Sequence, residues 1–169
     1  PAGTARALAP RIEQVPGAAL MWNPEFLREG FAVQDTLAPD RLVYGVPGAA
    51  EEDPRVGMLD AVYAPILEAG TPRLVMGYEA AELVKVSANA FLATKISFIN
   101  AFAEVTETVG GDIKTLADAI GHDSRIGRRF LNAGLGFGGG CLPKDIRALQ
   151  ARGSELGLSH TMGFLAEVD

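Results

Sequence analysis

Residues 79–109 contain neither glycine nor proline, and they are rich in Ala, Leu, Glu and Lys, which favour helix. At a rise of about 1.5 Å per residue, this stretch predicts one helix about 45 Å long. A helix that is apolar nearly all round is buried nearly all round, so we expect a second domain or another copy of the chain to cover this one. Its apolar residues occupy more than one stripe: one side carries Val84, Ala88, Phe91, Phe98, Phe102 and Val105, and others carry Leu83, Val86, Leu92, Ile96, Ile99 and Ala103.

The composition argues against several classes of partner. Hydrophobic residues make up 48% of the 169 residues, and the net charge of −6 is opposite to that of a nucleic-acid-binding surface. A single cysteine excludes an internal disulfide and a multi-cysteine zinc site, and the two histidines have no metal-binding spacing. No apolar run reaches the ~20 residues that cross a bilayer, and no signal peptide opens the chain. We expect a cytoplasmic protein without nucleic-acid, membrane or metal partners.

The part before residue 79 has an α/β pattern. Short apolar runs that end at turn residues predict strands at residues 18–22, 41–46 and 73–76. Helical spacing predicts helices at residues 5–15 and 51–69, the second kinked at Pro65. Because strand, helix and strand follow one another, we expect a parallel sheet.

The part after residue 109 is predicted to be mainly helical. Helices are expected at residues 113–120, 124–131, 144–156 and 161–168, and Asp112 is the expected N-cap of the first. The predicted fold class is therefore α/β followed by mainly α. Because the chain starts at Pro1 and stops at Asp169 inside a predicted helix, we interpret it as a fragment of a longer protein.

A glycine-rich segment leads into the only cysteine. Five glycines fall within residues 134–140, and Cys141 is followed by Pro143 and Lys144. Glycine lets a ligand approach the bare backbone, and proline is favoured in the first turn of a helix. We predict a loop and then a helix that opens near residues 142–145, with Cys141 at its positively polarised N-terminus. Such a place favours the nucleophilic thiolate. A lone cysteine is more often a small buried hydrophobe, but the tight order of loop, cysteine, proline and lysine favours a nucleophile.

Two pairs of polar residues are further candidates. Glu25 and Glu29 follow the first predicted strand, at the end where open α/β sheets bind ligands. Lys85 and Asn89 are four residues apart and project from one face of the long helix. Each pair also has a plain structural interpretation, as solvated charges for the glutamates and a snorkelling side chain for the lysine.

The segment GFGGGCLPKD resembles the catalytic cysteine segment of the UDP-glucose/GDP-mannose dehydrogenase family, whose members are NAD-dependent, four-electron oxidases of sugar nucleotides. The segments NPEFLREG and AELVKVSANAF match the same family in the same order. One local departure is Gly140, where the family often has serine. The resemblance implies the C-terminal part of a Rossmann-type NAD domain at residues 1–77 and a central helical dimerisation domain at residues 78–169. It also implies a homodimer formed through residues 79–109.

The resemblance further implies a role for each matching residue. Cys141 is the implied nucleophile, Lys85 stabilises the oxyanion, Asn89 fixes the substrate, Asp145 is an acid/base partner, and Glu25 orders the hydrolytic water. The implied contacts with NAD come from Glu29, Cys141 and Lys144. The remaining implied substrate contacts come from Phe26, Leu27, Arg28, Glu29, Arg125, Asn132, Phe137 and Gly138.

The implied reaction is the oxidation of UDP-glucose to UDP-glucuronate through a thiohemiacetal and a thioester on Cys141. GDP-mannose and UDP-N-acetylhexosamines are alternative substrates. Two other classes stay open: a non-catalytic helical dimerisation module, and a β-hydroxyacid dehydrogenase relative in which Lys85 is the acid/base and Cys141 is incidental. No G-x-G-x-x-G follows a predicted strand, so we expect the chain to be inactive alone.

Overall fold

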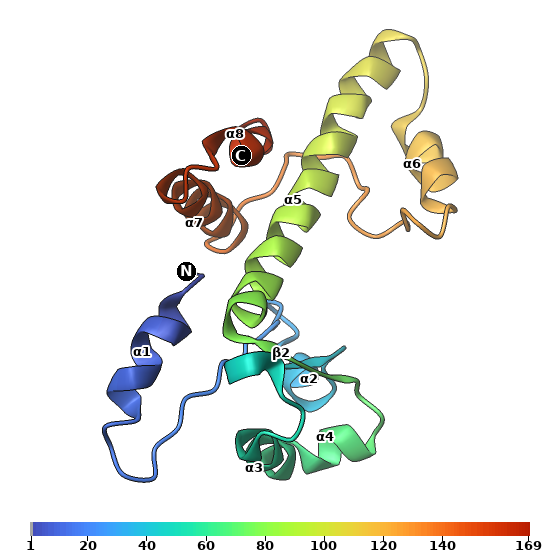
Figure 1. Ribbon diagram of the computed structural model, residues 1–169. Helices are drawn as coiled ribbons and strands as arrows, with labels where there is room; N and C mark the ends of the chain where they lie inside the picture. Colours follow the sequence, from blue (N-terminus) through green and yellow to red (C-terminus); the bar gives the residue numbers. More distant parts are fainter. Residues whose placement is uncertain (1) are drawn as a thin grey trace. The chain divides into compact units, whose positions relative to one another are not determined.

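The computed structural model describes residues 2–169, which divide into two compact units, one ending at Lys85 and the other beginning at Val86. Helix α5 (Tyr78–Thr108) belongs to both and is one continuous helix (Figure 1). It ends where Gly110 takes a φ of 76° and the N–H of Gly111 donates to the carbonyl of Thr106 at 2.8 Å. The long helix predicted at residues 79–109 is confirmed.

The first unit contains a parallel βαβ arrangement. Strand β1 pairs with β2 in parallel, with Leu42 opposite Arg73 and Val46 opposite Gly77, which confirms the predicted parallel sheet. Within residues 2–169 this sheet has two strands. The elements of this unit before α5 are α1 (Thr4–Ile12), α2 (Ala32–Leu37), β1 (Leu42–Val46), η1 (Pro47–Ala49), α3 (Pro54–Val62), α4 (Ala64–Glu68) and β2 (Arg73–Gly77).

Strand β1 forms the core of the first unit, because all five of its residues are buried. On one face, Tyr44 and Val46 pack against Val56 of α3. Gly45 faces α5, and a Cβ there would lie 2.7 Å from the Cβ of Ala81 and 2.9 Å from that of Trp22. Only glycine therefore fits at this close approach.

The predicted kink in residues 51–69 is confirmed, because α3 ends at Val62 and α4 begins at Ala64, just before Pro65. The strand predicted at residues 18–22 is wrong. Trp22 alone forms an isolated antiparallel bridge, in which it exchanges backbone hydrogen bonds with Gly45 at 2.7 and 2.9 Å. Pro24 has no N–H to donate, so the ladder does not continue beyond this bridge.

The second unit packs short helices against the later turns of α5 (Figure 1). These are α6 (Ile113–Gly121), α7 (Leu142–Glu155), α8 (Ser159–Met162) and η2 (Gly163–Ala166). One buried cluster joins Ala93 of α5 to Ile146 of α7 and Leu165 of η2. Another joins Ile99 of α5 to Ala117 of α6. The helices predicted at residues 113–120 and 144–156 are confirmed.

Two helical predictions in this unit need correction. Residues 124–131 form turns, because Gly127 and Phe130 take left-handed φ values of 70° and 65° that interrupt a helix. The helix predicted at residues 161–168 begins two residues earlier, at Ser159, and after Met162 it tightens into the 3-10 turn η2.

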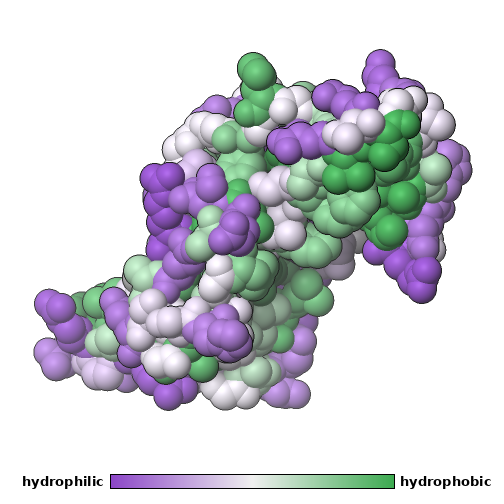
Figure 2. All heavy atoms as spheres, turned by 90° about the horizontal axis from the view of Figure 1, so that it is seen from above, coloured by the Kyte–Doolittle hydropathy of each residue, from purple (hydrophilic) through white to green (hydrophobic). Residues whose placement is uncertain are grey.

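Among residues 2–169, no helix combines the length and apolar character needed to cross a membrane. In the same part of the chain, no three His, Cys, Asp or Glu side chains gather as a metal site would require. Apolar residues nevertheless reach the surface, as the green areas among hydrophilic residues in Figure 2 illustrate. On α5 the exposed apolar side chains are Leu83, Phe91, Phe98, Phe102 and Val105.

Candidate active site

Cys141 is exposed and is the N-cap residue of α7. The helix begins where it was predicted, because Pro143 occupies the first turn and the N–H of Asp145 donates to the carbonyl of Cys141 at 3.0 Å. In the preceding loop, Gly136 and Gly139 take φ values of 93° and 77°, which glycine adopts without strain. An exposed sulfur thus lies at a helix end whose first N–H groups point toward an approaching anion.

Asp145 is the buried polar group next to this cysteine. It lies one helical turn after Cys141 and is 6% exposed. Its Oδ2 accepts a hydrogen bond from Nδ2 of Asn89 on α5 at 2.7 Å, and its Oδ1 lies 3.2 Å from Nζ of Lys144. Phe137 packs on the cluster that joins α5 and α7, and so ties the glycine-rich loop to both helices. Four predicted site residues, Asn89, Cys141, Lys144 and Asp145, are therefore neighbours in the second unit.

Lys85 and Glu25 form an ion pair in the first unit. The ammonium contacts Oε1 of Glu25, while Oε2 accepts the N–H of Leu27 at 2.7 Å. The lysine side chain is 32% exposed and that of Glu25 is 57% exposed, and the pairing gives the ammonium an opposite charge. Lys85 and Asn89 lie one turn apart on the same helix, as their spacing predicts.

The segment that carries Glu25 is irregular, so its four-residue spacing from Glu29 does not place the two glutamates on one helical face. The segment is anchored at its start by Asn23, whose Nδ2 donates to the carbonyl of Val43 at 2.9 Å and whose Oδ1 accepts the Tyr63 hydroxyl at 2.7 Å. Further along, the Arg41 guanidinium lies 3.9 Å from the centre of the Phe26 ring.

Arg28 anchors the other end of this segment through Asp35 of α2. Its backbone N–H and its Nε both donate to Oδ2 of Asp35, at 2.8 and 2.9 Å, and its Nη2 donates to Oδ1 at 2.5 Å. The hydrogen bonds from the Arg28 guanidinium hold the pKa of Asp35 below its usual value. Sequence reasoning missed both α2 and Asp35. The available signal was an acid seven residues after an arginine, across a turn in which Gly30 has a φ of 80°.

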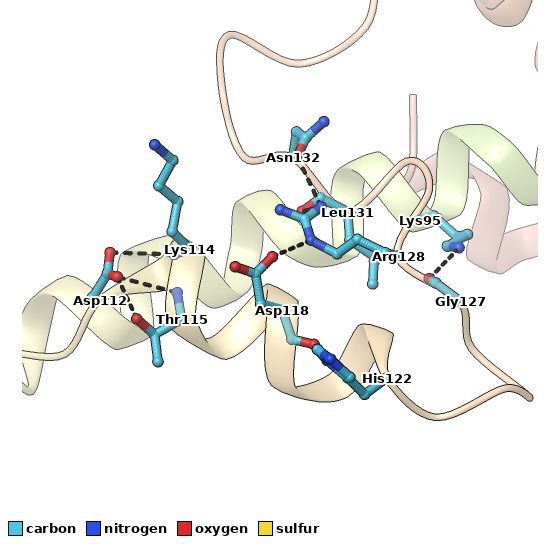
Figure 3. A network of polar contacts seen from close by, with 10 residues as sticks. All are labelled: Lys95, Asp112, Lys114, Thr115, Asp118, His122, Gly127, Arg128, Leu131 and Asn132. Atoms are coloured by element: carbon cyan, nitrogen blue, oxygen red, sulfur yellow. Dashed lines mark hydrogen bonds and ion pairs between the residues drawn. The ribbon is translucent and has the colours of Figure 1, made fainter.

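One predicted substrate residue, Asn132, lies in a polar network of the second unit (Figure 3). Arg128 donates from Nη1 to Oδ1 of Asn132 at 2.8 Å and to the carbonyl of Leu131 at 3.0 Å, and its Nε pairs with Asp118. Arg125 forks onto Asp123, with Nη2 2.6 Å from Oδ2, and its side chain is 87% exposed. The other predicted contacts, Leu27, Glu29 and Gly138, are exposed in their loops.

The same network contains the cap of α6. Oδ1 of Asp112 accepts the N–H of Lys114 at 3.2 Å, and Oδ2 accepts both the N–H and the hydroxyl of Thr115 (Figure 3). These bonds satisfy two of the N–H groups that a helix start leaves unpaired. The predicted capping role of Asp112 is confirmed.

Replacing Asp112 by alanine is expected to lower the free energy of unfolding, because two N–H groups lose their acceptor. The Thr115 hydroxyl, followed by the backbone N–H bonds, holds the pKa of Asp112 below its ordinary value of 3.8. The stabilisation is therefore complete above pH 3.8 and is lost as the pH falls through the lower folded pKa. Urea denaturation at neutral and stepwise lower pH measures it. Asp112→Asn keeps an acceptor that does not titrate, so an unchanged pH dependence in that variant would contradict the assignment.

One hollow of about 290 Å³ opens in the first unit beside Val46, the last residue of β1. It lies at the carboxyl end of a parallel strand, where open sheets bind ligands, but no predicted site residue lines it. The lining residues are Arg6, Ala9, Pro10, Glu13, Val46, Pro47, Gly48, Tyr78 and Glu79.

Family models match almost the whole chain. One described as the NAD binding domain of the UDP-glucose/GDP-mannose dehydrogenase family matches residues 1–67, and one described as the central domain of that family matches residues 79–168. The matches agree with a small parallel sheet followed by a long helical region, and they confirm the predicted fold class.

Individual relatives agree with the family models. A UDP-glucose 6-dehydrogenase of Rickettsia typhi is 54% identical over 127 residues, which are 75% of this chain and 28% of that protein. The chain thus spans less than a third of the length of this relative. A solved UDP-glucose dehydrogenase from the hyperthermophilic archaeon Pyrobaculum islandicum is 42% identical, with a TM-score of 0.86 over 99% of this chain and 38% of that one. A GDP-mannose dehydrogenase of Pseudomonas aeruginosa, solved as a ternary complex, is 33% identical, with a TM-score of 0.61 over 98% of this chain and 38% of that one.

Proposed function

Because the chain belongs to the UDP-glucose/GDP-mannose dehydrogenase family, we propose that it forms the catalytic part of an NAD-dependent enzyme that oxidises UDP-glucose to UDP-glucuronate. The observation that carries the proposal is the exposed sulfur of Cys141 at the start of α7, one turn from the buried Asp145 and its Asn89 partner. A buried thiol, remote from these polar groups, would not support covalent catalysis.

We assign no complete dinucleotide cradle to the described residues 2–169. The one G-x-G-x-x-G string, at residues 134–139, leads into α7 but follows no strand, so it lacks the context of the dinucleotide fingerprint. NAD supplies the hydride acceptor for each of the two oxidations. We assign the pyrophosphate cradle to the rest of the NAD-binding domain, with Glu29 and Lys144 as contacts contributed by this chain.

Cys141 provides the nucleophile for the middle of the reaction. Its thiolate attacks the C6 aldehyde left by the first oxidation, a C–S bond forms, and the carbonyl oxygen becomes the oxyanion of a thiohemiacetal. The Lys85 ammonium stabilises this oxygen, and Asn89 holds the substrate. Asp145 takes the proton of the thiohemiacetal hydroxyl as the second oxidation leaves a thioester on the sulfur.

Glu25 and Lys85 act again in hydrolysis. Water ordered by the Glu25 carboxylate adds to the thioester carbon, the C–S bond breaks, and a carboxylate and the free cysteine are released. The ion pair between Glu25 and Lys85 supports assigning both side chains to this step. In sum, one primary alcohol, one water and two NAD give one carboxylate, two NADH and three protons.

UDP-glucose is proposed over GDP-mannose because the solved UDP-glucose dehydrogenase is more similar to this chain, in identity and TM-score, than the solved GDP-mannose dehydrogenase. The test uses the complete enzyme, meaning the full-length protein that carries these residues. NADH production is measured with UDP-glucose, GDP-mannose and UDP-N-acetylmannosamine. We expect two NADH per UDP-glucose and none from the 169-residue chain alone. One NADH per sugar would contradict the four-electron scheme and favour a β-hydroxyacid type of chemistry.

The proposed partner is a second copy of the chain, bound through residues 79–109. Support comes from the exposed apolar side chains of α5, among which Phe98 and Phe102 are 46% and 39% exposed with ring centres 4.5 Å apart. Burial of such a patch between two copies removes it from water.

Replacing both Phe98 and Phe102 by serine is expected to convert a dimer of the complete enzyme into monomer, because the interface loses two aromatic side chains. Light scattering measures the mass. The matched control is Val62→Ser, which changes an exposed apolar side chain of α3 and should leave the mass unchanged. A monomeric unmutated enzyme would exclude the proposed dimer.

A further inference from the structure

We propose that Asp35 is a positioning residue for Glu25, acting through Arg28, and that its carboxylate thereby sets the rate of thioester hydrolysis. The inference rests on the proposed function, since it deepens the role given there to Glu25. Asp35 lies in the short helix α2, outside the three segments that resemble the family, and it contacts Arg28 at the end of one of them. Its effect on the reaction is therefore indirect.

The orientation of the Glu25 carboxylate depends on the path of the backbone just after it. One of its oxygens accepts the N–H of Leu27 at 2.7 Å, while the other meets Lys85. No helix or strand fixes residues 23–30. The backbone at Leu27 must therefore be held by contacts made on either side, or Glu25 loses its second anchor.

Asp35 supplies the contact on the C-terminal side. Its Oδ2 accepts the backbone N–H of Arg28, the residue after Leu27, at 2.8 Å. The same carboxylate accepts hydrogen bonds from Nε and Nη2 of the Arg28 side chain, so Arg28 is held by its backbone and its guanidinium together. The connecting turn is closed by the N–H of Phe31, which donates to the carbonyl of Arg28 at 3.0 Å, and the Phe31 ring lies 5.1 Å from the guanidinium carbon.

The low exposure of the Asp35 side chain and the engagement of both its oxygens favour a supporting role. Its side chain is 11% exposed, and both oxygens are engaged by Arg28. The Arg28 guanidinium is directed at this carboxylate, so we assign its side chain to holding the segment rather than to gripping substrate. A change at Asp35 should act through the placement of Glu25.

The chain contains a closely matched control. Asp53 accepts the backbone N–H, Nε and Nη2 of Arg55 at 2.9, 2.7 and 2.7 Å, and its side chain is also 11% exposed. This fork caps α3 and has no bond to the segment of Glu25. Asp35→Asn and Asp53→Asn therefore each neutralise a carboxylate that binds an arginine through the same set of donors, at two different places in the first unit.

The experiment compares these variants in the complete enzyme. We expect Asp35→Asn to slow thioester hydrolysis about tenfold or more, to lower kcat more than it changes KM, and to leave sugar attached to Cys141 that intact-mass spectrometry detects. Asp53→Asn should show no such adduct at a similar loss of thermal stability. Asp35→Glu, which restores a carboxylate, should recover part of the hydrolysis rate.

A double-mutant cycle with Glu25→Gln distinguishes positioning from general destabilisation. If Asp35 acts through Glu25, adding Asp35→Asn to Glu25→Gln causes little further loss of hydrolysis. A normal hydrolysis rate in Asp35→Asn, or a loss that is fully additive with Glu25→Gln, overturns this inference and leaves the proposed function standing. An unmutated enzyme that makes no NADH from any nucleotide sugar overturns the proposed function, and the inference with it.

Discussion

Replacing Cys141 by serine is expected to lower turnover of UDP-glucose in the complete enzyme by at least about 10³-fold, as is typical when a covalent nucleophile is removed. A serine hydroxyl stays protonated where a thiol ionises, and an alkoxide leaves a tetrahedral carbon less readily than a thiolate. In the proposed mechanism the second oxidation and the hydrolysis both depend on the C–S bond, so we expect them to fail together. Steady-state NADH formation and the yield of uronic acid measure the effect.

The fold of this variant should be unchanged, because Cys141 is exposed and its removal leaves no cavity in a core. An equal thermal midpoint would establish this. Leu135→Ala changes a fully exposed side chain in the same loop and should keep activity. Uronic acid made at the normal rate by Cys141→Ser would exclude covalent catalysis and leave Cys141 as an incidental surface thiol.

Replacing Lys85 by alanine should have the second largest effect, a loss of about 10²–10³ in kcat, the range seen when one oxyanion-stabilising group is removed. In the proposed mechanism the ammonium neutralises charge that develops on the C6 oxygen, and in the structure it contacts Glu25. Its loss should therefore slow formation of the thiohemiacetal and, later, hydrolysis of the thioester. Single-turnover measurements of each NADH separate the two oxidations.

Two further variants sharpen this second test. Lys85→Arg keeps the charge but changes its geometry, so it should recover only part of the rate. Lys114→Ala removes an exposed lysine of α6 and should leave kcat unchanged. If Lys85→Ala kept normal kcat and raised only KM, the lysine would bind substrate without stabilising the transition state.

The elements that could be predicted from sequence are those with local signals. Helix α5 follows from a long absence of glycine and proline, and its end from Gly110. The position of Cys141 follows from glycines before it and Pro143 after it. In each case the residues that decide the conformation are within a few positions of the element they shape.

The elements that could not be predicted depend on distant partners or on unusual φ values. Residues 18–22 are apolar enough for a strand, but only Trp22 finds a ladder partner, Gly45, more than twenty residues away. Phe130 takes a left-handed φ, which is uncommon for a phenylalanine and is therefore not predicted from its residue type. The pairing of Lys85 with Glu25 across sixty residues was not predicted either, and no pattern of neighbours encodes it.

Gly45 sets the distance between β1 and α5, and this distance affects residues outside the strand. A methyl group at this position would act as a wedge between β1 and Ala81 of α5. Lys85 lies one turn along the helix from Ala81, so the wedge would carry the ammonium away from Glu25. Gly45 has no side chain and no catalytic role, but the close packing that it allows determines the position of the Lys85 ammonium.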